Sequence, residues 1–248
     1  MVVKIAGLTD ESGARFLEQP FADLALLYAR VDDQAASVAR SVRLPCGPGC
    51  SACCRESVLV TPLEALYLMS RMQETLPSAE VDAVVRRGVA LFLRHRAPIL
   101  AFGQPPCPGA PPMESLDMLA MSPGDHGDDA VALQLDCPLL DEAGRCTAYA
   151  ARELRGRLYG LGSLPSKGRY FGCTMAQQQL VGQRPRLIDA EAVHAILRFL
   201  PLTASEQVIP FFLWRYSSLL LEGTLGDPEA VQSPTPSAGQ ASLSIWRS

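Results

Sequence analysis

Lysine is almost absent from this chain. Its 22 basic residues include only two lysines, Lys4 and Lys167, and nowhere do basic residues gather into a block. The formal net charge is −4. A nucleic-acid-binding protein needs a concentrated positive surface, so this composition argues against nucleic acid as a partner.

Long apolar runs are missing as well. The start, MVVKIAGLTDESG, meets Asp10 and Glu11 before an apolar segment develops, which argues against a secretory signal. The most apolar late stretch, VIPFFLWRYSSLLL, is short and carries Arg215 at its centre, so it does not predict a membrane span. We therefore expect a soluble, cytoplasmic protein without membrane contact. The sequence identifies no protein partner and no oligomeric state.

Familiar catalytic patterns are also lacking. No G-x-G-x-x-G predicts a Rossmann nucleotide loop, and no G-x-S-x-G predicts a serine nucleophile. None of the 3 histidines, His95, His126 and His194, has a second histidine three or four positions away, so we expect each to be structural or exposed. Asp125, Asp128 and Asp129 lack the spacing of a calcium loop, which favours a solvated loop.

Apolar periodicity predicts a mainly helical chain. Residues 14–42 predict a helix whose main part starts at Pro20, and 61–76 predict another, with Thr61 as N-cap, Pro62 at the first position and Glu64 closing a capping box. We also expect helices over 78–95, from about Asp189, and from Ser205 to Leu221 with a kink at Pro210. The residues expected to face the core are Phe21, Leu24, Leu27, Tyr28, Val31, Val81, Val84, Val85, Val89, Phe92, Leu93, Val193, Ile196, Leu197 and Leu200.

The remaining stretches predict loops. Residues 98–130 are rich in proline and glycine, and Asp141 to Gly144 predict a tight turn between two short extended segments. We expect a single domain over residues 1–222 and a disordered tail over 223–248, with no internal repeat. The predicted fold class is mainly α: one irregular helical domain with long loops organised around a cysteine-bound metal centre.

What the chain does have is clustered cysteine. Four cysteines lie within nine residues of LPCGPGCSACCRES, and others follow much later in the chain. Thiolates bind soft or borderline metals, and short glycine-containing loops let several sulfurs converge. In a reducing compartment such clusters favour metal over disulfides. The candidate metal ligands are Cys46, Cys50, Cys53, Cys54, Cys137, Cys146 and Cys173.

The cysteine pattern is also compatible with roles other than metal binding. Seven thiolates exceed the four that one zinc or one cubane cluster needs, which indicates a multinuclear site or some bystanders. Cys107, alone among prolines, is expected to be a bystander. Structural disulfides are the alternative, and a thioredoxin-like Cys50–Cys53 pair is weaker because Cys46 and Cys54 flank it.

The combination CGPGCSACC, then CPLLDEAGRCTAYAAR, then GC resembles the YkgJ-like cysteine-cluster family, described as a zinc- or iron-chelating domain. The resemblance covers residues 44–175. The matching residues are Cys46, Cys50, Cys53, Cys54, Cys137, Pro138, Leu140, Gly144, Cys146, Tyr149, Arg152 and Arg157. Two positions depart from the family pattern R-P-x-x-C-R: Glu153 replaces the proline and Gly156 replaces the cysteine. A ligand expected at position 156 is therefore missing, and Cys173 could complete the site.

The resemblance implies a small helical domain around a cysteine-bound metal, with iron or an iron–sulfur cluster slightly favoured and zinc as the alternative. A related domain occurs in flagellin lysine methylases, which keeps methyl transfer open. Nearby residues could assist such a centre: Arg152 and Arg157 could offset thiolate charge, as Arg43, Arg55, Arg145 and Arg155 could to a lesser degree. Tyr149 is expected in the core and Glu153 on a helix surface, although a carboxylate can also ligate iron or zinc.

Three functions remain open at this stage. The chain could be a metal- or cluster-binding module with a structural, sensory or metal-handling role. It could be an enzyme that modifies a protein or small molecule, with the metal domain as scaffold. It could also be an interaction module that uses the metal to display its loops. The first is favoured because the sequence contains no independent catalytic constellation.

Overall fold

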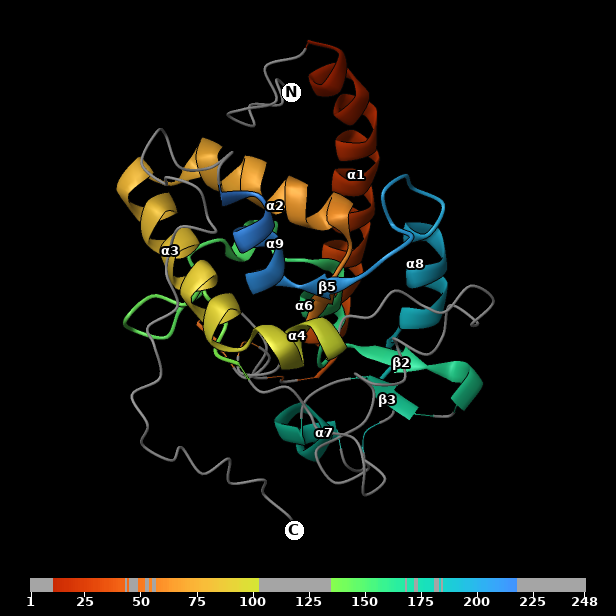
Figure 1. Ribbon diagram of the computed structural model, residues 1–248. Coiled ribbons are helices and arrows are strands. Elements are labelled where there is room, and N and C mark those ends of the chain that lie inside the picture. The colour runs from red at the N-terminus through yellow and green to blue at the C-terminus, as the bar shows by residue number, and fades with distance from the viewer. Residues whose placement is uncertain are drawn as a thin grey trace.

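The computed structural model in Figure 1 describes residues 11–42, 44, 49–51, 54, 57–102, 135–167, 169–171, 174–180, 183 and 185–217. The described part of the chain is mainly helical and forms one domain, as the periodicity predicts. The expected loop beyond Phe102 and the expected tail lie outside the described residues. Among the residues described, no helix is both long and apolar enough to cross a membrane.

Four helices build most of the core. They are α1 (Glu11–Ser41), α2 (Pro62–Thr75), α3 (Ser78–Arg94) and α9 (Ile209–Arg215). In Figure 1, α1 stands along one side, α2 runs across it, and α9 packs against α3. The predicted stripe of α1, from Phe21 to Val31, is buried. Pro20 does not start the helix as predicted but lies inside it, because a full turn forms before the proline.

The capping prediction for α2 is confirmed. The Thr61 side chain accepts from the backbone N–H of Glu64, the Glu64 carboxylate accepts from the backbone N–H of Thr61, and Pro62 occupies the first turn. In α3 the predicted apolar stripe is buried except at Leu93, which is exposed at the end of the helix, while Val89 is half-buried against the core.

The remaining elements are short. They are α4 (Arg96–Phe102), η2 (Tyr149–Ala151), α6 (Leu154–Leu158), η3 (Pro165–Lys167), α7 (Thr174–Leu180) and α8 (Ala190–Leu197), with strands β1 (Leu59–Val60), β2 (Gly162–Leu164), β3 (Arg169–Phe171), β4 (Ile188–Asp189) and β5 (Gln207–Val208). β1 pairs antiparallel with β5, placing Leu59 opposite Val208. β2 pairs antiparallel with β3 and parallel with β4.

Two predictions in the last third of the chain need correction. Asp189 caps α8 as predicted, but Ile196 is half-exposed, and His194 is buried next to Val193 in its place. The helix expected from Ser205 begins only at Ile209, because Gln207 and Val208 pair with β1. Pro210 therefore lies in the first turn of α9, where a missing N–H costs nothing, and does not kink the helix.

A further correction concerns the middle of the chain. Helix α4 extends to Phe102, into a segment that the sequence predicts as a loop.

Candidate metal centre

A backbone hydrogen bond joins the two cysteine segments. The N–H of Cys137 donates to the carbonyl of Cys54 at 2.7 Å, although α2, α3 and α4 separate these residues in sequence. Cys54 is itself held in a short turn, because its N–H donates to the Ser51 carbonyl at 3.0 Å. Gly49, just before Cys50, has a φ of 94°, a conformation that a residue with a side chain rarely adopts.

The predicted turn after Cys137 forms a small hairpin. Leu140 and Cys146 pair as an isolated antiparallel bridge, and the N–H of Asp141 donates to the Arg145 carbonyl at 2.8 Å. Gly144 has a φ of 72°, which glycine allows at the turn. The Asp141 carboxylate accepts from the backbone N–H and Nε of Arg145, and these hydrogen bonds lower its pKa. The hairpin thus brings Cys137 and Cys146 to the same end.

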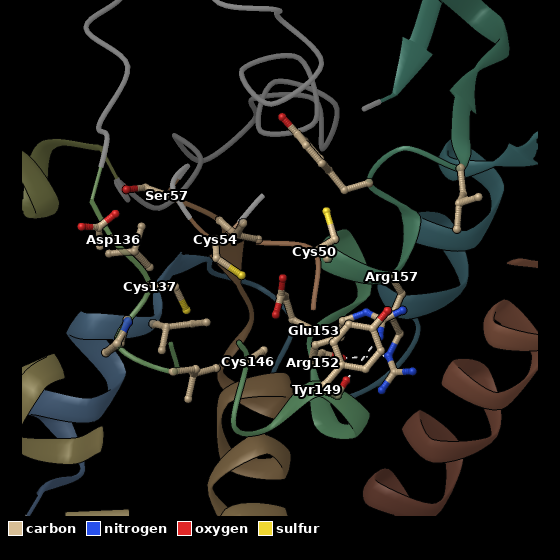
Figure 2. Close-up of a pocket in the computed structure, with 18 of the residues that line it drawn as sticks. Cys50, Cys54, Ser57, Asp136, Cys137, Cys146, Tyr149, Arg152, Glu153 and Arg157 are labelled. Atoms are coloured by element: carbon tan, nitrogen blue, oxygen red, sulfur yellow. Dashed lines mark hydrogen bonds between the residues drawn. The ribbon is translucent and has the colours of Figure 1, made fainter. Parts of the chain in front are cut away.

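All four cysteines that the structure describes, Cys50, Cys54, Cys137 and Cys146, line one cavity of about 340 Å³. Figure 2 shows them around it, together with Ser57, Asp136 and a group of polar side chains from η2 and α6. None of these four described cysteines forms a disulfide, and all are half-buried. Ala35, Ala36 and Ala39 of α1 and Ile209 and Pro210 of α9 complete the wall.

The other predicted ligands, Cys46, Cys53 and Cys173, lie outside the described residues, as does Cys107. Within the described part, no three His, Cys, Asp or Glu side chains lie close enough together to hold one metal ion. The chemistry of the donor set nevertheless suits a soft or borderline metal, because four cysteines share one cavity with a buried carboxylate.

That carboxylate belongs to Glu153, which is not on the helix surface as predicted. Glu153 is 7% exposed, precedes α6 as its N-cap and lines the cavity. Its side chain makes no capping hydrogen bond. Figure 2 shows its carboxylate directed into the space between Cys54 and Cys50.

A second buried carboxylate explains why Glu153 need not cap α6. Glu64 reaches across from α2, and its Oε1 accepts from the backbone N–H of Leu154 at 2.9 Å and from the Tyr28 hydroxyl at 3.1 Å. Burial raises the pKa of Glu64, and burial together with the nearby Glu64 charge raises the pKa of Tyr28 well above its ordinary value. The sequence shows Glu64 only as part of its own capping box, so its second role in fixing α6 was missed.

Two of the predicted arginines line the cavity. Arg157 is buried: its Nε donates to the Arg152 carbonyl at 2.8 Å, its Nη2 donates to the Ala150 carbonyl at 2.5 Å, and its Nη1 pairs with Asp32 of α1. Its guanidinium also lies over the Tyr28 ring at 4.1 Å. These contacts fix Arg157 as a brace between α6 and α1 at the cavity wall.

The Arg152 guanidinium makes a cation–π contact with Tyr149. Its guanidinium is 3.9 Å from the centre of the Tyr149 ring, its Nη1 donates to the Tyr149 carbonyl, and its Nη2 is 3.9 Å from the Asp32 carboxylate. Tyr149, expected in the core, is instead half-buried at the cavity wall. The pair adds positive charge and an aromatic ring to a site lined by thiols.

Other predicted charge-compensating arginines lie elsewhere. Arg145 is exposed on the hairpin and pairs with Asp141. Arg155 is buried on the other side of α6, where its Nη2 donates to Glu206 at 2.7 Å. Neither lines the cavity, and Arg43 and Arg55 lie outside the described residues.

The two described histidines, His95 and His194, do not line the cavity. His95 is half-buried at the end of α3, and His126 lies outside the described residues. His194 is buried in α8, with Nε2 3.9 Å from Glu206 and Nδ1 without a hydrogen-bond partner among the described residues. Burial, followed by the charge of Arg155, lowers the pKa of His194 to about 3, so it is neutral at ordinary pH.

Comparison with known proteins adds no identification. No family model matches the chain, and neither the curated proteins nor the solved structures provide a match. The resemblance to the YkgJ-like cysteine-cluster family therefore remains a prediction based on the motif residues, and the function is argued from the cavity.

Proposed function

We propose that this protein binds a metal through its cysteines, at the cavity lined by Cys50, Cys54, Cys137 and Cys146. The remaining ligands come from Cys46, Cys53 and Cys173. The observation that carries the proposal is that cysteines from two segments far apart in sequence line the same cavity, held together by the hydrogen bond from Cys137 to Cys54. Iron or an iron–sulfur cluster is slightly favoured over zinc.

The surroundings support a metal more than a disulfide. None of the four described cysteines forms a disulfide, and the cavity wall also holds Ser57, whose Oγ has no hydrogen-bond partner among the described residues. Arg152 and Arg157 at the wall offset the negative charge that several thiolates would bring together. A reducing cytoplasm would keep these thiols available for a metal. When bound, a zinc ion would fix the loops, whereas an iron–sulfur centre would add electron transfer or oxygen sensing.

Elemental analysis tests the proposal first. Protein purified without oxygen and without added metal should contain iron with acid-labile sulfide, or zinc, in a fixed ratio to the chain. A visible spectrum separates a coloured cluster from colourless zinc. Folded protein free of metal would contradict the proposal and return attention to thiol chemistry at Cys50 and Cys53.

Cysteine variants locate the site. Cys50→Ser and Cys146→Ser should each lose metal and soluble yield, because a serine hydroxyl is a poor ligand for a soft metal. Cys107→Ser is the control and should lose neither. Equal metal content in all three variants would contradict the assignment of Cys50 and Cys146 as metal ligands.

An enzyme that modifies a protein or small molecule is the second candidate. The cavity volume of about 340 Å³ exceeds what one ion fills and lies at the lower end of the range for small-molecule pockets. A thermal-shift screen of metal-loaded protein against S-adenosylmethionine tests this candidate. A rise in melting temperature that Tyr149→Ala abolishes would favour the enzyme over a purely structural or sensory module.

A further inference from the structure

We propose that Glu153 is a metal ligand, so that a carboxylate oxygen stands in this chain where a cysteine is expected at position 156. The inference rests on the proposed metal-binding function and deepens it. It concerns the class of donor atoms, and therefore the class of metal, that the cavity accepts.

The geometry of α6 joins Glu153 and Gly156. The two residues are three positions apart at the start of the helix, and the Glu153 side chain folds back over the glycine. A Cβ built on Gly156 would fall against Oε1 of Glu153 and lie 3.1 Å from its Cδ. The carboxylate therefore occupies the space next to Gly156, and a side chain at position 156 would displace it from its present position.

The carboxylate has no protein partner in the described residues. Glu153 is 93% buried, yet no hydrogen-bond donor or cationic group there reaches its oxygens. The α6 N-terminus does not need it, because Glu64 accepts the N–H of Leu154. The carboxylate opens on the cavity, where its negative charge is available to a bound cation.

The neighbouring arginines are committed elsewhere. Arg157 gives its donors to Asp32 and to two backbone carbonyls, and Arg152 lies on the Tyr149 ring and donates to the Tyr149 carbonyl. Asp32, half-exposed at the edge of the cavity, forms ion pairs with both arginines. Glu153 thus remains directed toward Cys54 and Cys50, as Figure 2 shows.

The donor set that follows is mixed. Carboxylate oxygen binds zinc and iron alongside sulfur, but it is a harder ligand than thiolate. One oxygen among the sulfurs would disfavour the softest metals, such as Cu(I), and mark one ligand position as chemically different from the rest. A cysteine at position 156 would have given sulfur donors alone.

The test compares four proteins purified without oxygen: the wild type, Glu153→Gln, the double variant Glu153→Ala/Gly156→Cys, and Glu142→Gln as an exposed carboxylate control. Iron and zinc per chain are measured as purified. Each protein is then stripped, reduced and titrated with Co²⁺, and the sulfur-to-cobalt charge-transfer absorption and the affinity are recorded, with far-ultraviolet circular dichroism to check folding.

We expect Glu153→Gln to bind Co²⁺ at least about 10-fold more weakly than the wild type, since even residues behind the ligands can change affinity 10- to 100-fold. The double variant should regain affinity and show stronger charge-transfer absorption, because it replaces an oxygen donor with sulfur. Glu142→Gln should match the wild type. If Glu153→Gln fails to fold, the double variant decides the question through its charge-transfer intensity.

Two results would overturn the inference separately from the proposed function. Wild-type affinity for Co²⁺ in Glu153→Gln, or in the double variant without added charge-transfer absorption, would remove Glu153 from the ligands while leaving the cysteine site standing. A wild type that neither contains metal when purified nor binds Co²⁺ would overturn the metal-binding function itself, and with it the role of Glu153.

Discussion

Single buried ionisable side chains set the pH dependence of this protein. His194 has a pKa of about 3 when folded against an ordinary 6.5. Between these values the unfolded chain carries a proton on His194 that the folded chain does not, so the free energy of unfolding falls as the pH falls through this window. Burial is the main cause of the low pKa of His194, and the nearby Arg155 and Arg198 lower it further, whereas Glu206 acts in the opposite direction.

Glu64 makes the opposite contribution to the pH dependence of the free energy of unfolding. Because burial raises its pKa, the folded chain holds a proton at pH values where the unfolded chain has released it. Stability from this group is fully present below the ordinary carboxyl pKa and is lost as the pH rises through the folded pKa. The pH profile of the wild type alone therefore mixes two opposed contributions.

The His194→Gln variant separates the contribution of His194 from that of Glu64. Gln stays neutral, so the variant should lose the acid sensitivity that comes from His194. Relative to the wild type, it should gain about 2 kcal/mol in the free energy of unfolding on going from about pH 7 to about pH 4.5. Urea unfolding at both pH values measures this, with His95→Gln as the control that should change nothing. Parallel profiles for His194→Gln and the wild type would contradict the assignment.

At the scale of elements, α3 and α9 approach each other closely at one glycine. A Cβ on Gly88 would lie 2.8 Å from the Leu213 Cβ and 3.1 Å from its Cγ, closer than atoms normally pack. The phenyl ring of Phe92 stacks on Trp214 of α9 at 4.3 Å along the same contact. The contact thus requires a glycine at a helical position where alanine is otherwise preferred.

Gly88→Ala should therefore destabilise the protein by about 1–3 kcal/mol, because overpacking exceeds the gain in helix propensity of about 1 kcal/mol. Chemical denaturation provides the measurement. In Gly88→Ala/Leu213→Ala the added methyl has room, so the two changes together should cost less than their sum. A Gly88→Ala variant more stable than the wild type would show that the helices can move apart freely.

The elements also show what the sequence could predict. The capping box of α2, the Asp189 cap of α8 and the turn at Gly144 follow from local rules, and the structure confirms all three. The start of α9 does not follow from local rules, because Gln207 and Val208 pair with β1 and so are not part of the helix. Pro20 is similar: local preference predicts a helix start, but the turns on both sides are stable enough to include it.

The candidate site divides in the same way. That the cysteines of two distant segments belong together is a prediction from motif spacing, and four of them line one cavity. The position of Glu153 could not be predicted, since its burial depends on Glu64 capping α6 from another helix. Glu153 and Gly156, three positions apart in the sequence, lie directly against each other in the fold.

At the scale of the whole molecule, the helical core extends well beyond the cysteine-lined cavity. The larger cluster of buried side chains spans α1, α2, α3, α6, α8 and α9, and a second cluster surrounds Phe92. A chain with this much buried apolar surface can fold without an ion as its nucleus. The cavity lies at one edge of that core, between α1, the hairpin and α6.

Removal of the metal should therefore loosen the site without unfolding the protein. After chelation, we expect most of the far-ultraviolet circular dichroism to remain, while the melting temperature falls and amides of residues 137–146 exchange faster with deuterium. Hydrogen-exchange mass spectrometry measures this, with α3 as the internal reference. Complete loss of helical signal would show that the core depends on the ion.

The hydrogen bond from Cys137 to Cys54 has a consequence for how the protein matures in the cell. The first cysteines leave the ribosome well before Cys137 and Cys146 have been synthesised, and α2, α3 and α4 must fold in between to bring the segments together. The early cysteines are thus synthesised before the hairpin exists. If the protein binds a metal as proposed, we expect metal insertion to be a late event after synthesis, and its success to depend on how reducing the cell remains during that interval.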